Sequence, residues 1–171
     1  MIYTMATDGS TIYRNPGVMR IGGVILDQDE KLVHMFFNKL KRGTNSVAEY
    51  EALLKGLEEA RRLGVTRIQC YVDSQLVYNQ LTGAYKIKCR HLKPLAWKVK
   101  NEMAKFEYCE LRWSSRETPI CTVADAVSKE QTFNKGEPLW QMELLTQQKL
   151  GPQKKSSSTS DTGEQKLMQA N

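Results

Sequence analysis

Residues 44–83 read TNSVAEYEALLKGLEEARRLGVTRIQCYVDSQLVYNQLTG, and this stretch decides the fold class. Apolar residues recur at helical spacing over residues 47–63, and Gly64 follows as a helix stop. The β-rich run 67–72 predicts a strand, and residues 74–81 predict a short second helix. A strand set between two helices indicates a sheet whose strands are joined by helical crossovers.

The segments on either side extend this sheet. Three β-rich runs precede the long helix and follow one another through short loops, which predicts an antiparallel meander. Later strands reached through helices add in parallel. The predicted class is therefore an α/β fold with a five-stranded mixed sheet flanked by helices. The remaining predicted elements are strands at 2–7, 21–26, 32–40 and 108–114, and helices at 92–106 and near 123–130. Helical spacing among apolar neighbours places Trp97 in the core.

Length and composition indicate one domain with a tail. The chain has 171 residues, of which 40% are hydrophobic and 26% charged. We expect the domain to span residues 1–133 and a C-terminal extension to span 134–171, partly disordered because residues 151–171 are polar and small. Residues 138–150 fit either a short helix or a loosely docked extension. The net charge is +6, and most of it belongs to residues 1–133, which favours an anionic partner.

Other classes of protein are disfavoured. No apolar run approaches the length of a membrane-spanning helix, and the first residues do not resemble a secretion signal. The four cysteines, Cys70, Cys89, Cys109 and Cys121, lack metal-ligand spacing, which favours a reduced compartment. We therefore expect an intracellular monomer, of the cytoplasm or nucleus, that makes no use of a membrane.

Acidic residues stand where the predicted strands end. Asp8 follows the first strand and Asp73 follows the strand at 67–72. If those strands are parallel neighbours, the two carboxyl groups lie together at the edge where α/β sheets place their sites. Each Asp, taken alone, equally suits a turn or a helix cap.

The long helix and the last helix offer further acids. At 100° per residue, Glu49 lies about 80° from the centre of the apolar face and Glu51 about 120° from it. Glu49 is thus at the edge of the buried face, although both suit an ordinary first helical turn. Asp125, between small apolar residues, suits either a cap or a ligand. Converging carboxylates need a cation, and Mg²⁺ is the natural choice. Two such ions predict hydrolysis of a phosphodiester.

Four motifs in this order resemble the ribonuclease H family across residues 2–131. They are Thr7-Asp8-Gly9-Ser10 followed by Asn15-Pro16-Gly17, then Thr44-Asn45-Ser46-Val47-Ala48-Glu49-Tyr50, Val72-Asp73-Ser74-Gln75-Leu76-Val77 and Ala124-Asp125-Ala126. The amino-acid sequence of the middle section is similar to that of the branch with archaeal-type and plant members. The resemblance implies a ribonuclease H-like fold that cleaves the RNA strand of RNA–DNA hybrids with two ions of Mg²⁺ or Mn²⁺.

The resemblance also implies roles for individual residues. The catalytic, metal-binding acids would be Asp8, Glu49, Asp73 and Asp125. The residues that contact nucleic acid would be Gly9, Ser10, Asn15, Thr44, Asn45 and Gln75. Two loops depart from the family pattern: the opening loop is one residue longer, and the loop at 114–123 lacks the usual His and is about two residues longer.

A basic stretch follows the helix that carries Gln75. Lys86, Lys88 and Arg90 belong to it, and in the family this region grips the DNA strand. A solvated helix face explains the same charges equally well. The alternative function is a ribonuclease H-like module that binds nucleic acid but has lost efficient chemistry, because the altered loop precedes Asp125.

Overall fold

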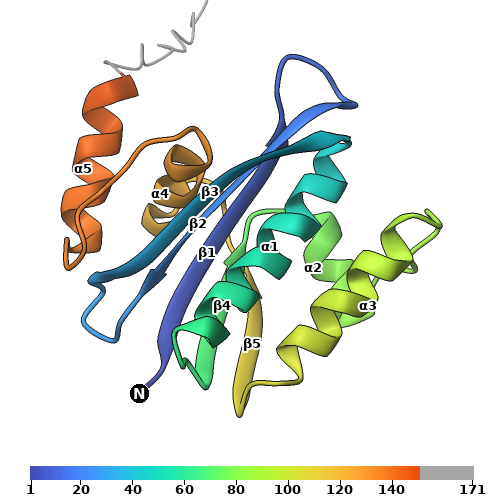
Figure 1. Ribbon diagram of the computed structural model, residues 1–171, viewed down its shortest axis with the longest axis horizontal. Coiled ribbons are helices and arrows are strands. Elements are labelled where there is room, and N and C mark those ends of the chain that lie inside the picture. Colours follow the sequence, from blue (N-terminus) through green and yellow to red (C-terminus); the bar gives the residue numbers. More distant parts are fainter. Residues whose placement is uncertain (151–171) are drawn as a thin grey trace, which may run out of the picture.

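The computed structural model describes residues 1–150, so the tail predicted for 151–171 lies outside the described residues. Five strands form one mixed sheet in the order β3-β2-β1-β4-β5, with helices on both faces (Figure 1). The predicted fold class is confirmed. The elements are β1 (Tyr3–Thr11), β2 (Gly17–Leu26), β3 (Leu32–Gly43), α1 (Asn45–Arg62), β4 (Arg67–Val72), α2 (Gln75–Thr82), α3 (Leu92–Met103), β5 (Tyr108–Trp113), α4 (Pro119–Ser128) and α5 (Leu139–Leu150). None of the helices within residues 1–150 combines the length and apolar character needed to cross a bilayer.

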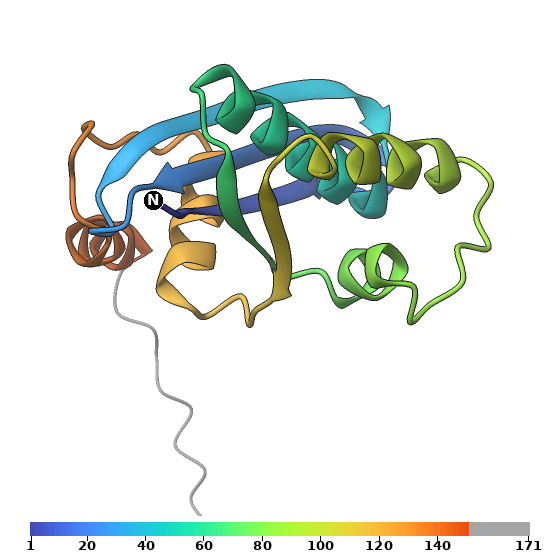
Figure 2. The ribbon, with the colours of Figure 1, turned by 90° about the horizontal axis from the view of Figure 1, so that it is seen from below.

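The sheet separates two apolar layers. Figure 2 shows α1 and α3 on one side of the sheet and α4 with α5 on the other. Adjacent residues of β1 serve both sides, because side chains alternate along a strand: Met5 packs with Leu53 and Leu57 of α1, and Ala6 packs with Val123 and Val127 of α4. β1 is thus the buried centre of the molecule.

The first strand is longer than the sequence pattern indicates. The prediction that it ends at Thr7 is wrong, because β1 continues through Asp8 to Thr11. Its parallel ladder with β4 does stop at Thr7, opposite Val72, but the antiparallel ladder with β2 continues from Asp8 to Thr11. Backbone pairing with β2 therefore keeps the polar residues extended.

Two further expectations on the later elements are corrected. The helix expected near 123–130 begins earlier, at Pro119, so half of the expected 114–123 loop is helical. Proline suits the first helical turn because it lacks an N–H that would stay unpaired there. Trp97 is not in the core: its exposed fraction is 66%, while Ala96 and Val99 fill the buried face of α3.

Residues beyond 133 form a helix that packs on the domain. Met142 of α5 is fully buried in the same apolar cluster as Val123, Val127 and Phe133. The segment before α5 is tied to the β2–β3 hairpin, since Leu32 N–H donates to the Glu137 carbonyl at 2.9 Å. Of the two alternatives for residues 138–150, the structure has the helix.

Candidate active site

Three carboxylates from three elements converge at one end of the central strands. Asp8 lies on β1, Glu49 on α1 and Asp73 directly after β4. One ligand oxygen of each lies within 4.8 Å of those of the other two. The parallel ladder explains the pairing of the two Asp residues: its last pair is Thr7 and Val72, so Asp8 and Asp73 come next on neighbouring strands. The structure thus brings together three of the four predicted acids.

Local packing sets Glu49 against β1. The Thr44 side chain caps α1 by accepting from Val47 N–H, which starts the helix at Asn45. Gly9 lets the first turn of α1 touch the strand, because a Cβ there would lie 2.2 Å from the Ala48 carbonyl oxygen. The sequence therefore needs glycine at this position for close packing, and the packing carries Glu49 to the carboxylates.

Asp73 is free to join this cluster because its neighbour takes the capping role. Ser74 is the N-cap of α2, and its hydroxyl accepts from Val77 N–H at 3.4 Å. Sequence reasoning left Asp73 as either a cap or a site residue. In the structure the cap is Ser74, and the Asp73 carboxylate turns to the cluster.

The cluster is electrostatically strained by burial and like charge. Burial raises the pKa of Glu49 well above its ordinary value, and the charges of Asp8 and Asp73 raise it further. Burial also raises the pKa of Asp8, while a hydrogen bond from the Ser128 hydroxyl at 2.6 Å opposes that shift. A nearby cation would stabilise the ionised forms.

One such cation is Arg116, from the loop before α4. Its Nε lies 2.7 Å from Asp73 Oδ2, and its Nη2 lies 3.8 Å from Asp8 Oδ1. This guanidinium holds down the pKa of both Asp8 and Glu49. It touches the edge of the cluster without forming a hydrogen bond to Asp8 Oδ1 or to Asp73 Oδ1.

Two carboxylate oxygens of the cluster show whether the site suits a divalent ion. Asp8 Oδ1 and Asp73 Oδ1 are buried and have no hydrogen-bond partner within residues 1–150. Buried carboxylate oxygens are rarely left unsatisfied, and oxygen is the ligand that Mg²⁺ and Mn²⁺ prefer. Together with Glu49, they form an all-oxygen donor set that suits either ion.

Asp125 lies apart from the three converging carboxylates. It is near enough for its charge to raise the pKa of Asp8, but its Oδ2 accepts from Lys129 Nζ at 2.6 Å, and Lys129 is the residue that caps the end of α4. Its role as a fourth ligand stays a prediction.

Several of the residues predicted to contact nucleic acid already have contacts within the protein. Asn45 is tied to the β1–β2 loop: its Oδ1 accepts from Thr11 N–H and hydroxyl at 2.9 and 2.7 Å, and its N–H donates to Asn15 Oδ1 at 3.2 Å. Ser10 accepts from Arg20 Nε at 2.9 Å. Gly9 is buried against α1, so its observed role is packing. The Asn45 contacts tie the β1–β2 loop to the start of α1.

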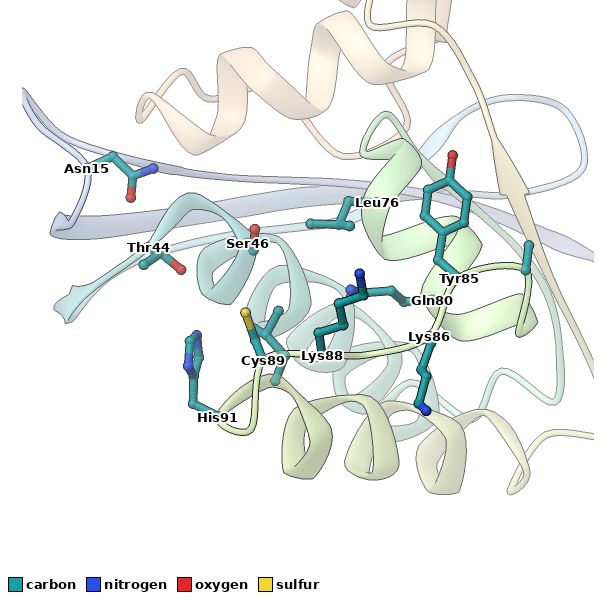
Figure 3. Close-up of a pocket in the computed structure, with 12 residues that line it drawn as sticks. Asn15, Thr44, Ser46, Leu76, Gln80, Tyr85, Lys86, Lys88, Cys89 and His91 are labelled. Atoms are coloured by element: carbon teal, nitrogen blue, oxygen red, sulfur yellow. The ribbon is translucent and has the colours of Figure 1, made fainter.

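A cavity of about 700 Å³ opens beside the site, between the start of α1 and the loop after α2. Asn15, Thr44, Lys86 and Lys88 all line it. Figure 3 shows the Lys88 side chain directed toward the middle of this group and the Lys86 side chain directed away. Gln75 and Arg90 are exposed nearby in the chain and do not line the cavity.

Sequence reasoning missed two residues that contact the carboxylates, Ser128 and Arg116. Ser128 reaches Asp8 because Gly22, opposite Asp8 in the sheet, admits the end of α4: a Cβ at Gly22 would lie 2.4 Å from Ser128 N. A small residue one turn after Asp125 was the only available signal. Arg116 could be named as a basic residue in the altered loop, but its direction depends on where α4 begins.

Comparison with known proteins agrees with this geometry. A family model described as reverse transcriptase-like matches residues 6–131. The solved structure of LC11-RNase H1, isolated from compost, matches with a TM-score of 0.68 at 32% identity, over 75% of this chain and 93% of that one. The chain belongs to the ribonuclease H family.

Other ribonuclease H proteins define how far the match extends. A ribonuclease HI of Halobacterium salinarum is 34% identical over 118 residues, which are 68% of this chain and 57% of that protein. The chain spans 28% of the length of longer mycobacterial relatives, at 33% identity. A structure of LC11-RNase H1 in complex with an RNA/DNA hybrid matches with a TM-score of 0.62 at 30% identity, over 67% of this chain and 86% of that one.

Proposed function

We propose that this protein hydrolyses the RNA strand of RNA–DNA hybrids with the help of Mg²⁺ or Mn²⁺. The observation that carries the proposal is the set of converging carboxylates, with two buried oxygens lacking partners, beside a cavity lined by lysines. Support comes from the ribonuclease H relatives, one of which is a structure with a bound RNA/DNA hybrid. The domain's positive charge suits a polyanionic substrate.

The carboxylates of Asp8, Glu49 and Asp73 would hold the metal, with Asp125 as a further ligand once Lys129 releases it. Two ions held there would supply activation of the attacking water and stabilisation of the leaving oxygen. Ser128 holds one oxygen of Asp8 and so directs the other oxygen to the cluster. Arg116 balances the negative charge at the edge of the site.

The surrounding residues would hold the substrate. Lys88, directed toward the middle of the cavity residues, attracts a backbone phosphate, and the binding should weaken steeply as salt rises. A hybrid duplex offers 2′-hydroxyls in a wide and shallow minor groove, so an RNA strand can be recognised without reading its sequence. Asn15 and Thr44, which line the cavity, provide polar groups for such contacts.

The test compares labelled RNA–DNA hybrid, double-stranded RNA and double-stranded DNA, each with Mg²⁺, with Mn²⁺ and with a chelator. We expect cleavage of the hybrid alone, and only with a metal. Asp73→Asn should abolish cleavage, whereas Asp29→Asn, an exposed Asp in the β2–β3 turn, should leave it unchanged. Absence of hybrid cleavage under every condition would remove the proposal.

A second candidate is a module that binds hybrids without efficient turnover. The observation that favours it is the ion pair between Asp125 and Lys129, which keeps this acid out of the converging group. It predicts tight hybrid binding in fluorescence anisotropy alongside negligible cleavage. Cleavage by the parent distinguishes the two candidates, and Lys129→Ala then tests the cause, because freeing Asp125 should restore turnover only if the pairing is what limits it.

A further inference from the structure

The loop between β1 and β2 presents a tyrosine in an unfavourable backbone conformation. Tyr13 has φ of +65°, the left-handed region that a bulky residue rarely adopts. Arg14 N–H donates to the Ile12 carbonyl at 2.8 Å, which closes a tight turn around Tyr13. The Tyr13 side chain buries no surface against the described residues, because its exposed fraction is 104%. Because no contact within residues 1–150 compensates for this unfavourable conformation, the conformation points to a role in binding another molecule.

The backbone that carries Tyr13 is firmly held. On one side, Thr11 donates twice to Asn45 Oδ1, and on the other, Asn15 Oδ1 accepts from Asn45 N–H. Gly17 closes the loop so tightly that a Cβ there would lie 2.2 Å from the Arg14 carbonyl oxygen. The ring therefore projects from a fixed base, and ordering it on contact costs only the side chain's own freedom.

The position of the loop relates it to the carboxylates. Tyr13 is five residues after Asp8. At about 3.3 Å per residue of extended strand, the Cα atoms of the two residues are at most about 16 Å apart. Successive phosphates of one strand advance about 3.4 Å along a duplex axis, so this span corresponds to about five base pairs. Asn15, two residues on, already lines the cavity beside the site.

We propose that the Tyr13 ring packs against the sugar edges of the minor groove of the hybrid, within about five base pairs of the cleaved bond. This inference rests on the proposed function and adds a contact to the same site. The wide, shallow groove of an A-form-like duplex accepts a flat ring, and tyrosine offers an apolar body with a polar tip. The contact should contribute to affinity and leave the chemical step unchanged.

The experiment compares Tyr13→Asn with Tyr13→Phe. Asn tolerates the left-handed backbone, so Tyr13→Asn removes the ring while the loop and the melting temperature are kept. Trp140→Ala is the matched control, because Trp140 is 66% exposed on α5, next to the β2–β3 turn at the other end of β2. Hybrid affinity is measured by anisotropy in the Asp73→Asn background, which prevents cleavage, and KM and kcat are measured with Asp73 intact.

We expect Tyr13→Asn to raise the Kd and the KM about five- to tenfold, the low end of what an aromatic contact to nucleic acid supplies, with kcat unchanged. Tyr13→Phe and Trp140→Ala should stay within about twofold of the parent. Hybrids shortened one pair at a time should lose the Tyr13 effect when fewer than about five pairs remain on one side of the cut.

The outcomes separate this inference from the proposed function. If the parent cleaves the hybrid and Tyr13→Asn binds it equally well, the Tyr13 contact is overturned and the proposed function stands. If Tyr13→Phe loses as much affinity as Tyr13→Asn, packing by the ring is overturned. If the parent neither binds nor cleaves the hybrid, the proposed function itself has failed.

Discussion

Replacing Arg116 with glutamine is expected to tighten divalent-metal binding in the protein free of nucleic acid. The Arg116 guanidinium lies 2.7 Å from Asp73 and 3.8 Å from Asp8, so it repels a second cation from the same carboxylates. Unit charges 4 Å apart interact with about 4 kcal/mol at the effective dielectric near a protein surface. The side chain is 64% exposed, and ion pairs of that kind are worth about 1 kcal/mol at most.

The expected gain is therefore about 1 kcal/mol, or about fivefold in Kd. Its pH dependence follows from the carboxyl groups. Arg116 lowers the pKa of Asp8 and Glu49, so its loss raises both pKa values and lets protons compete with the metal. The gain should thus be largest at high pH and shrink as the pH falls.

Isothermal titration with Mn²⁺ at two pH values measures both effects. Arg112→Gln is the matched control, since Arg112 is an exposed arginine that pairs with Glu110 on β5. Equal or weaker metal affinity in Arg116→Gln at high pH, with Arg112→Gln at the parent value, would refute the competition between the guanidinium and the metal.

Three further changes test the packing of the domain and one group of ion pairs. Gly9→Ala should lower the melting temperature and weaken Mn²⁺ binding, because its Cβ would collide with Ala48; Gly64→Ala, in open space at φ +79°, should cost about 1 kcal/mol and spare metal binding. Met142→Ala should lower the free energy of unfolding by about 3 kcal/mol in urea titrations, and a loss below about 1 kcal/mol would contradict its buried position. Bonds from Lys55 and Arg62 lower the pKa of Glu59 from 4.5 to about 2, so its stabilisation is present above pH 4.5 and lost as the pH falls toward 2. Glu59→Gln should therefore cost about 1 kcal/mol at pH 7 and nothing near pH 2, as measured by denaturation at each pH.

The sequence predicts the sheet and the converging acids because those features follow from local pattern. The acids Asp8 and Asp73 stand directly beyond apolar runs, and the angular position of Glu49 on its helix already places it at the edge of the buried face. The helix expected at residues 47–63 is α1, which begins two residues earlier.

What the sequence does not predict depends on tertiary contacts. The extension of β1 beyond Thr7 needs the β2 ladder. Trp97 is exposed because α3 packs beside α1 through the face that carries Ala96 and Val99. Arg116 and Ser128 meet the carboxylates only after α4 has docked over Gly22. No hydrophobic pattern within a single segment predicts those contacts.

The hydrogen bond from Ser128 to Asp8 joins residues 120 positions apart in the chain. This contact can form only when the chain is complete as far as residue 128. During synthesis, Asp8, Glu49 and Asp73 leave the ribosome well before Ser128 does. A growing chain thus has the three converging acids long before it has the geometry to hold an ion. Any ion that binds the finished centre binds only the complete domain, and so raises its melting temperature in proportion to the logarithm of the ion concentration.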